Sequence, residues 1–235
     1  MPFSEKTIKF LGTNKENNSK EWYHAHKDDL ERYVRQPFEE LINEVLPVIQ
    51  ECDPYADCNP RIGRGISRIY RDTRFSYDKT LFRSSCWCTF MRPKKLYPDT
   101  PAFYFEITPF GVAYGCGYYW MDKEHIARVR DMVEQKDDFW IAANDAYMSQ
   151  NVFVLEGEKY KRTKFPHLSD EARNWADRKS IALSTFSPNR ELMFSPDLPK
   201  VVAEDMRKIF PVYTFLFEAA QSKEVAKITK DTYWR

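Results

Sequence analysis

The spacing of apolar residues changes near residue 60, and this change limits what the chain can fold into. Before it, large apolar side chains recur at helical spacing, as at Trp22 and Leu30. After it, residues 61–120 are rich in β-branched and aromatic residues, and Phe103 and Phe105 alternate with polar neighbours, as in a strand. The sequence therefore predicts N-terminal helices followed by a β-rich centre.

Cap residues and prolines predict where the first helices begin and end. Asn18 precedes Glu21 by three positions, which is a capping-box pattern. Pro37 fits the first turn of the next helix. Pro47 is expected to end or kink that helix, because proline lacks the backbone donor.

Helices are predicted again after the β-rich centre. Asp122 is the expected cap of one helix, and a second covers residues 137–148. Ser169 opens a short helix. The last helix begins near Pro199, with a kink expected at Pro211.

Closely spaced strands predict the kind of sheet. Segments 86–91, 102–108 and 112–120 follow one another across short turns, which implies hairpins. Two more short strands are expected near residues 152–155 and 181–186. The predicted fold class is therefore α+β, with a mainly antiparallel central sheet, N-terminal helices and a long C-terminal helix. A mixed sheet is the alternative.

No repeat, low-complexity linker or composition shift divides the 235 residues, so a single domain over 1–235 is predicted. Its expected parts are an N-terminal helical part (1–50), a β-rich core (61–120), helices (122–150), strands with a short helix (152–187) and a C-terminal helix (198–220).

Charge and cysteine content exclude several classes of protein. The net charge of +1 disfavours a nucleic-acid partner, because general nucleic-acid binders are strongly basic. No signal peptide is expected, because the N-terminus has no apolar stretch that follows a basic one. No membrane span is expected, since no run of eighteen apolar residues occurs. The five cysteines lack the paired spacing of zinc sites, so no metal site is predicted. A reducing cytoplasm is the expected location.

Positive charge is concentrated in residues 61–83, which hold seven basic residues and only two acidic ones. Convergent arginines are a common means of binding phosphate or carboxylate groups in two-pronged geometry. If residues 68–74 form a strand, Arg68, Asp72 and Arg74 share one face, on which an ion-pair ladder is expected.

The leading hypothesis is a pocket for a small anionic, phosphate-bearing ligand, with catalysis left open. Asp72, Asp78 and Lys79 are the candidate catalytic residues, because a carboxylate beside arginines orients them, acts as a base or holds a metal. No cofactor is predicted, and the oligomeric state is left open. The expected ligand-binding residues are Arg68, Arg71, Arg74, Lys79, Arg83, Lys161 and Arg162.

Two other functions fit the same residues. In the first, the chain is an interaction or scaffold module, and its arginines and aspartates form a structural ion-pair network. In the second, it binds single-stranded nucleic acid, with aromatic residues between Phe103 and Trp120 stacking on bases beside the basic patch.

Several motifs of the chain are characteristic when taken together: Asn17-Asn18-Ser19-Lys20-Glu21-Trp22-Tyr23, Arg68-Ile69-Tyr70-Arg71-Asp72-Thr73-Arg74-Phe75, Asp78-Lys79-Thr80, Gly115 to Trp120, Tyr160-Lys161-Arg162 and Lys179. Through them the chain resembles, from about Thr7 to Ala219, the conserved uncharacterised proteins grouped as domain of unknown function 2461. This resemblance implies a single soluble α/β domain and names no activity, substrate or cofactor.

Two segments depart from the pattern of that family. Where the family usually has Pro-Tyr-Lys, this chain has Leu81-Phe82-Arg83, and Lys164-Phe165-Pro166 replaces the usual Pro-Lys-Gly. The tyrosine hydroxyl is lost, but Arg83 keeps the positive charge. This favours an electrostatic role for the position over proton donation.

Overall fold

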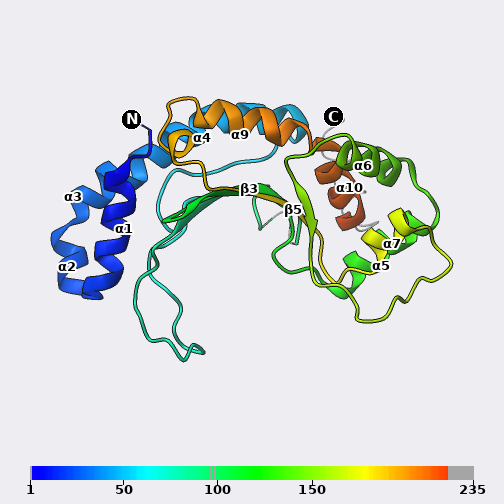
Figure 1. Cartoon of the computed structure of the whole chain (residues 1–235), viewed down its shortest axis with the longest axis horizontal. Coiled ribbons are helices and arrows are strands. Elements are labelled where there is room, and N and C mark those ends of the chain that lie inside the picture. Colours follow the sequence, from blue (N-terminus) through cyan, green and yellow to red (C-terminus); the bar gives the residue numbers. More distant parts are fainter. Residues whose placement is uncertain (1, 96, 98, 222–235) are drawn as a thin grey trace. The chain divides into compact units, whose positions relative to one another are not determined.

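Helices and strands occur in the order that the periodicity predicts (Figure 1). The computed structural model describes residues 2–95, 97 and 99–221. The helices are α1 (Glu5–Asn17), α2 (Lys20–Ala25), α3 (Lys27–Leu30), the π-helix η1 (Glu31–Arg35), α4 (Gln36–Cys52), α5 (Lys123–Glu134), α6 (Asp138–Met148), α7 (Asp170–Ala176), α8 (Arg190–Met193), α9 (Leu198–Arg207) and α10 (Phe210–Ala220). The strands are β1 (Cys86–Phe90), β2 (Ala102–Thr108), β3 (Gly111–Gly117), β4 (Val154–Glu156) and β5 (Ala182–Ser187).

In the described part of the chain, five strands form one sheet in the order β1-β2-β3-β5-β4. β1 pairs with β2 in antiparallel register, with Cys86 opposite Ile107. β4 pairs with β5 in the same manner, with Leu155 opposite Leu183. The structure confirms the predicted fold class, a single α+β domain with an antiparallel sheet.

Contacts within this domain separate two compact units, each described by itself below. The first comprises the described residues of 1–91, 103–114 and 185–207, and the second those of 92–102, 115–184 and 208–221.

The core of the first unit lies between helices and the strands β1 and β2. α4 and α9 lie side by side over one face of these strands (Figure 1). Alternate residues of each strand are buried, as Phe90 and Phe105 show, because one strand face is turned toward the helices. Burying such a side chain stabilises the fold by about 1.5–3 kcal/mol. Cys86 and Cys88 belong to this buried face, and all five cysteines of the chain are free thiols.

Helix packing forms the core of the second unit. α10 packs against α6 and α5, and α7 packs against α5. The indole of Trp175 is fully buried and donates a hydrogen bond to Asn144 Oδ1 at 3.0 Å. Pro211 lies in the first turn of α10, where its missing donor is not needed.

Two local expectations need correction. Asn18 does not cap the second helix: it ends α1 in the left-handed conformation, with φ 49°, which asparagine tolerates. Ser19 caps α2 instead, and its Oγ accepts the N–H of Trp22 at 3.2 Å. Of the two outcomes predicted for Pro47, an end of the helix does not occur. α4 continues to Cys52 because its apolar face stays packed on both sides of the proline.

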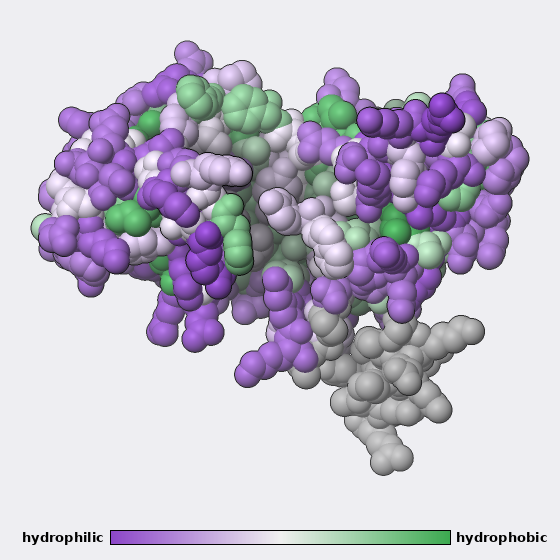
Figure 2. Space-filling view, turned by 90° about the horizontal axis from the view of Figure 1, so that it is seen from below, coloured by the Kyte–Doolittle hydropathy of each residue, from purple (hydrophilic) through white to green (hydrophobic). Residues whose placement is uncertain are grey.

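The face of the molecule in Figure 2 is mostly hydrophilic, with hydrophobic side chains in separate patches. Several aromatic residues are nevertheless highly exposed, among them Phe75 at 95% and Tyr77 at 106%. Single exposed apolar side chains are common in soluble proteins, but two such rings close together in one loop are not.

Candidate functional site

Residues 68–83 form an irregular hairpin, which we call the charged hairpin. Two backbone hydrogen bonds join its arms: Arg71 N–H donates to Leu81 O at 2.8 Å, and Arg83 N–H donates to Ile69 O at 2.9 Å. The hairpin extends away from the sheet, in cyan in Figure 1. It places the candidate ligand-binding arginines on a projecting element of the first unit.

The strand considered for residues 68–74 does not form, and in this segment only Tyr70 makes an isolated antiparallel bridge, with Phe82. The chain turns at Arg74 and Phe75 instead of continuing. The cause is local, because Asp72 Oδ1 accepts the backbone N–H of Arg74 at 3.2 Å. Such an aspartate turn competes with strand pairing. Asp72 and Arg74 therefore do not form the strand-face ladder with Arg68 that the sequence suggested.

The base of the charged hairpin is anchored on α2. The rings of Tyr23, Tyr70 and Phe82 pack together, with centroids 4.6–5.3 Å apart, and Phe82 is fully buried. Asn18 Oδ1 accepts the N–H of Leu81 at 2.6 Å. Two segments about sixty residues apart in the sequence are thus joined at this point.

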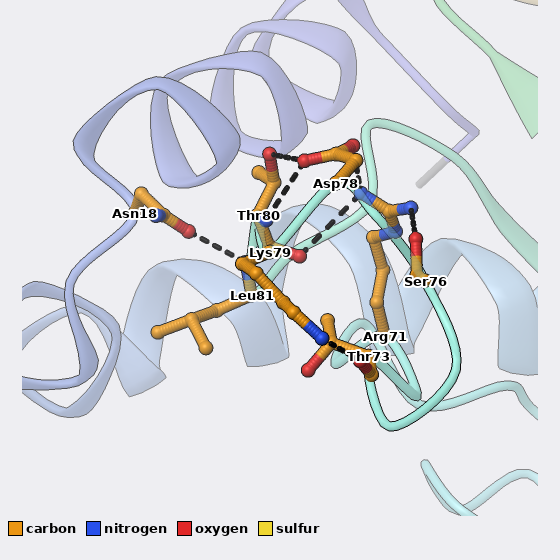
Figure 3. A network of polar contacts seen from close by, with 8 residues as sticks. All are labelled: Asn18, Arg71, Thr73, Ser76, Asp78, Lys79, Thr80 and Leu81. Atoms are coloured by element: carbon orange, nitrogen blue, oxygen red, sulfur yellow. Dashed lines mark hydrogen bonds and ion pairs between the residues drawn. The ribbon is translucent and has the colours of Figure 1, made fainter.

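A polar network stiffens the hairpin beyond its base (Figure 3). The guanidinium of Arg71 pairs with Asp78 and donates to Ser76 Oγ at 3.4 Å. Asp78 also accepts the N–H of Thr80 at 2.9 Å. Lys79 Nζ donates to the carbonyl of Thr73 at 2.9 Å, which closes the tip.

Arg74 is also occupied within the hairpin. Its Nε lies 2.9 Å from Asp72 Oδ1 and its Nη2 lies 2.6 Å from Oδ2, a two-pronged pair. Both side chains are more than half exposed, so solvent screens this pair strongly. The pair occupies one of the two-donor edges of the Arg74 guanidinium and neutralises its charge.

These contacts lower the pKa of both carboxyl groups. Hydrogen bonds from Arg74 lower the pKa of Asp72 to about 2. Hydrogen bonds from Thr80, followed by those from Arg71, hold the pKa of Asp78 well below its usual range. A carboxylate with a lowered pKa is a weaker base, so the geometry favours an orienting role for both residues over proton abstraction. A catalytic role for Asp72, Asp78 or Lys79 stays a prediction.

Arg68 and Arg83 have different surroundings from Arg71 and Arg74. The guanidinium of Arg83 lies 4.6 Å from the ring centroid of Trp87 and donates to the carbonyl of Arg68 at 3.3 Å. The side chain of Arg68 lies against Gly63, where a Cβ would come within 3.1 Å of Arg68 Nε. Among the residues that the structure describes, neither arginine has a carboxylate partner.

Lys161 and Arg162 belong to the second unit, in the segment that follows β4. Both side chains are exposed. Their neighbour Tyr160 is surrounded by cations: its hydroxyl accepts a hydrogen bond from Arg130 Nη2 at 3.2 Å, and Lys164 Nζ lies 4.0 Å from its ring centroid. The structure thus describes two separate groups of basic residues, one in each unit.

One family model, described as "Conserved hypothetical protein (DUF2461)", matches residues 6–215. The chain belongs to the DUF2461 family. No curated protein matches the sequence, and no solved structure matches it either. The resemblance seen in the sequence motifs is therefore confirmed, and the match itself names no activity.

The structure explains physically why the DUF2461 signature has separate pieces. Asn18 and Tyr23 come from its first piece, and both contact the charged hairpin, which holds the second. These residues secure one loop on one helix. Part of the DUF2461 signature in this chain therefore has a structural role. Arg68 also belongs to the signature, but it has no carboxylate partner among the described residues.

Sequence reasoning missed two features of this DUF2461 chain. The exposure of Phe75 and Tyr77 has no local signal, because aromatic residues are usually buried. Tyr160 was noticed only as part of a motif, since Arg130 approaches it from a helix thirty residues away. Among the described residues no group of three or more histidine, cysteine, aspartate or glutamate side chains is arranged to hold a metal ion. No described helix is long and apolar enough to cross a membrane.

Proposed function

We propose that the chain binds a small phosphate-bearing anion at the base of the charged hairpin, through Arg68 and Arg83. The observation that carries this proposal is that the guanidinium of Arg83 contacts the main chain of Arg68 and that neither arginine has a carboxylate partner among the described residues. Trp87 and the carbonyl of Arg68 hold the guanidinium of Arg83 in place, so little side-chain entropy is lost on binding.

The paired residues have a supporting role in this proposal. Arg71 and Lys79 stiffen the hairpin, and Arg74 is held by Asp72. Each charge-assisted hydrogen bond to a ligand contributes about 1.5–3 kcal/mol. Two arginines that each donate two such bonds contribute about 6–12 kcal/mol before the cost of association is subtracted. We infer a cytoplasmic location, which the free cysteines support.

Thermal unfolding with a panel of nucleotides and phosphorylated metabolites tests this function. A ligand at a hundred times its Kd stabilises the fold by about 2.7 kcal/mol, or roughly 5–10 °C in Tm for a chain of this size. Arg68→Gln and Arg83→Gln are expected to lose the shift. Arg74→Gln removes the same charge and is expected to keep it, because Asp72 already occupies Arg74.

Two results would contradict the proposal. In the first, no compound raises Tm by more than about 1–2 °C. In the second, Arg74→Gln abolishes the shift as fully as Arg68→Gln, which means that only overall charge matters. The Tm of each variant without ligand checks that it has folded.

A second candidate is a single-stranded nucleic acid, and the exposed rings of Phe75 and Tyr77 favour it. They lie at the tip of a braced loop beside Arg74 and Lys79, where bases have room to stack. Stacking contributes about 1–3 kcal/mol per base. Fluorescence anisotropy with labelled oligonucleotides is expected to show binding that weakens with salt and is lost in Phe75→Ala/Tyr77→Ala. Binding that the double variant retains would exclude this candidate.

A further inference from the structure

Three cationic side chains surround the ring of Tyr160 in the second unit. Lys164 Nζ lies 4.0 Å from the ring centroid, the guanidinium carbon of Arg130 lies 5.3 Å from it, and Lys179 Nζ lies 5.6 Å from it. Lys179 pairs with Glu158 at 2.5 Å. Within the described residues, Arg130 and Lys164 have no carboxylate partner. Two of the three cations therefore lack a carboxylate counter-charge within the described residues, which favours the binding of an anion.

Arg130 is held rigidly in this cluster. Its Nε donates to the carbonyl of Ala176 at 3.0 Å, and its Nη2 donates to the carbonyl of Arg178 at 2.9 Å. The same Nη2 donates to Tyr160 Oη at 3.2 Å. This hydrogen bond, aided by the charges of Arg130 and Lys164, lowers the pKa of Tyr160. Negative charge is therefore favoured beside the hydroxyl.

Tyr160 also lines an open pocket of about 500 Å³, a size suited to a small molecule. The amides of Asn144 and Asn174 offer neutral hydrogen-bonding groups on its wall. Most of the acidic charge there is already engaged. Asp170 pairs with Arg173, and Asp177 Oδ1 accepts the backbone N–H of Lys164 at 2.9 Å. Glu171 is the remaining carboxylate of the lining.

We propose that Tyr160, Arg130 and Lys164 form an oxyanion site, which binds the phosphate or carboxylate of a small polar molecule whose body lies in this pocket. Arg130 and Lys164 supply positive charge, and the Tyr160 hydroxyl donates its proton in a hydrogen bond to the ligand. Lys161 and Arg162, both exposed on the same segment, add to the local positive charge. The proposal uses no residue of the charged hairpin and does not depend on its function.

The test uses NMR of protein in which the Cζ carbon of every tyrosine is isotopically labelled. The Tyr160→Phe variant lacks one of these resonances, which identifies the signal of Tyr160. The probes are inorganic phosphate and acetate, each titrated at constant ionic strength against chloride. We expect a saturable change at Tyr160 and a rise in its pKa, because a bound anion disfavours the tyrosinate. Lys164→Gln is expected to weaken binding about ten-fold or more, the loss of one charge-assisted hydrogen bond.

The matched control is Lys200→Gln, which removes an exposed lysine of α9 in the first unit. It is expected to leave the response of Tyr160 unchanged. A response to either anion that Lys164→Gln weakens supports the site, and the effective anion identifies the preferred oxyanion. The proposal is overturned if neither anion gives a saturable response. It is also overturned if Lys164→Gln and Lys200→Gln weaken anion binding equally. Arg68→Gln and Arg83→Gln leave this titration unaffected, so it fails or succeeds independently of the hairpin.

Discussion

Arg71 and Arg83 lie on opposite arms of the charged hairpin and have different surroundings. The side chain of Arg71 is 24% exposed and donates to Asp78 and Ser76. Arg83 stacks on Trp87 and has no carboxylate partner in the described chain. The first is held by the fold, whereas the second keeps donors for a ligand.

Arg71→Ala is therefore expected to destabilise the protein by about 1–2 kcal/mol, because several hydrogen bonds of a half-buried side chain are lost. Arg74→Ala is expected to leave stability nearly unchanged, since its pair with Asp72 is exposed. Urea unfolding of the two variants measures the difference. Equal stability of Arg71→Ala and the wild type would remove the bracing role given to Arg71.

The Asp72 carboxyl predicts a pH dependence of stability. Its folded pKa of about 2 lies below the ordinary value of 3.8, so the pair with Arg74 stabilises the fold above that ordinary value. This contribution is lost as the pH falls from about 4 to about 2. Asp72→Asn is expected to show a slightly shallower fall of Tm across this window than the wild type, a small effect because solvent screens this exposed pair. If the Tm of Asp72→Asn and of the wild type fell equally steeply with pH in low salt, the Asp72 carboxyl would not be the source of this pH dependence.

At the scale of elements, the joint between α2 and the charged hairpin depends on Asn18. This residue combines a left-handed backbone with a side-chain acceptor for the Leu81 N–H. Asn18→Gly keeps the backbone conformation and loses the acceptor, which costs about 1 kcal/mol. Asn18→Ala also introduces strain of roughly 1–2 kcal/mol. Urea unfolding separates the two effects, and hydrogen exchange at Leu81 is expected to speed up in both variants. An unchanged exchange rate would show that the hairpin is anchored elsewhere.

The elements that the sequence predicted correctly have strong local signals. Ser169 and Asp122 cap α7 and α5 as expected, because a short polar side chain before a periodic run is enough to start a helix. The signal for the turn after Asp72 was mixed, since aspartate favours turns whereas Tyr70, Thr73 and Phe75 around it are typical of strands. Whether Asp72 accepts the Arg74 N–H or extends a strand depends on its surroundings.

The candidate sites could be predicted only in part, and sequence separation is the reason. Arg68 and Arg83 were named from local charge, and both remain candidates for ligand binding. Tyr160 acquires its surroundings from Arg130 on α5 and Lys179 before β5. The periodicity of a short sequence segment carries no information on contacts between residues this far apart. The cluster around Tyr160 can therefore be identified only from the folded structure.

At the scale of the whole molecule, the near-neutral charge hides local differences. The chain carries a net charge of +1, yet among the described residues each unit holds cations without a carboxylate partner, Arg68 and Arg83 in the first and Arg130 and Lys164 in the second. The interaction-module alternative accounts for Arg71 and Arg74, which pair with carboxylates within the hairpin. It leaves the charges of Arg83 and Arg130 without a carboxylate partner among the described residues. This uneven distribution is what makes ligand binding the better hypothesis for both groups.

The free cysteines give each unit an internal chemical reporter. Cys86 and Cys88 are buried in the first unit, and Cys116 is buried in the second. Burial raises the pKa of the Cys86 thiol to about 12, so almost no thiolate is present at neutral pH. A thiol-specific reagent is expected to modify partly exposed Cys52 first and the buried thiols only as fast as their unit opens. Mass spectrometry of the labelled peptides then times the opening of each unit without an added probe.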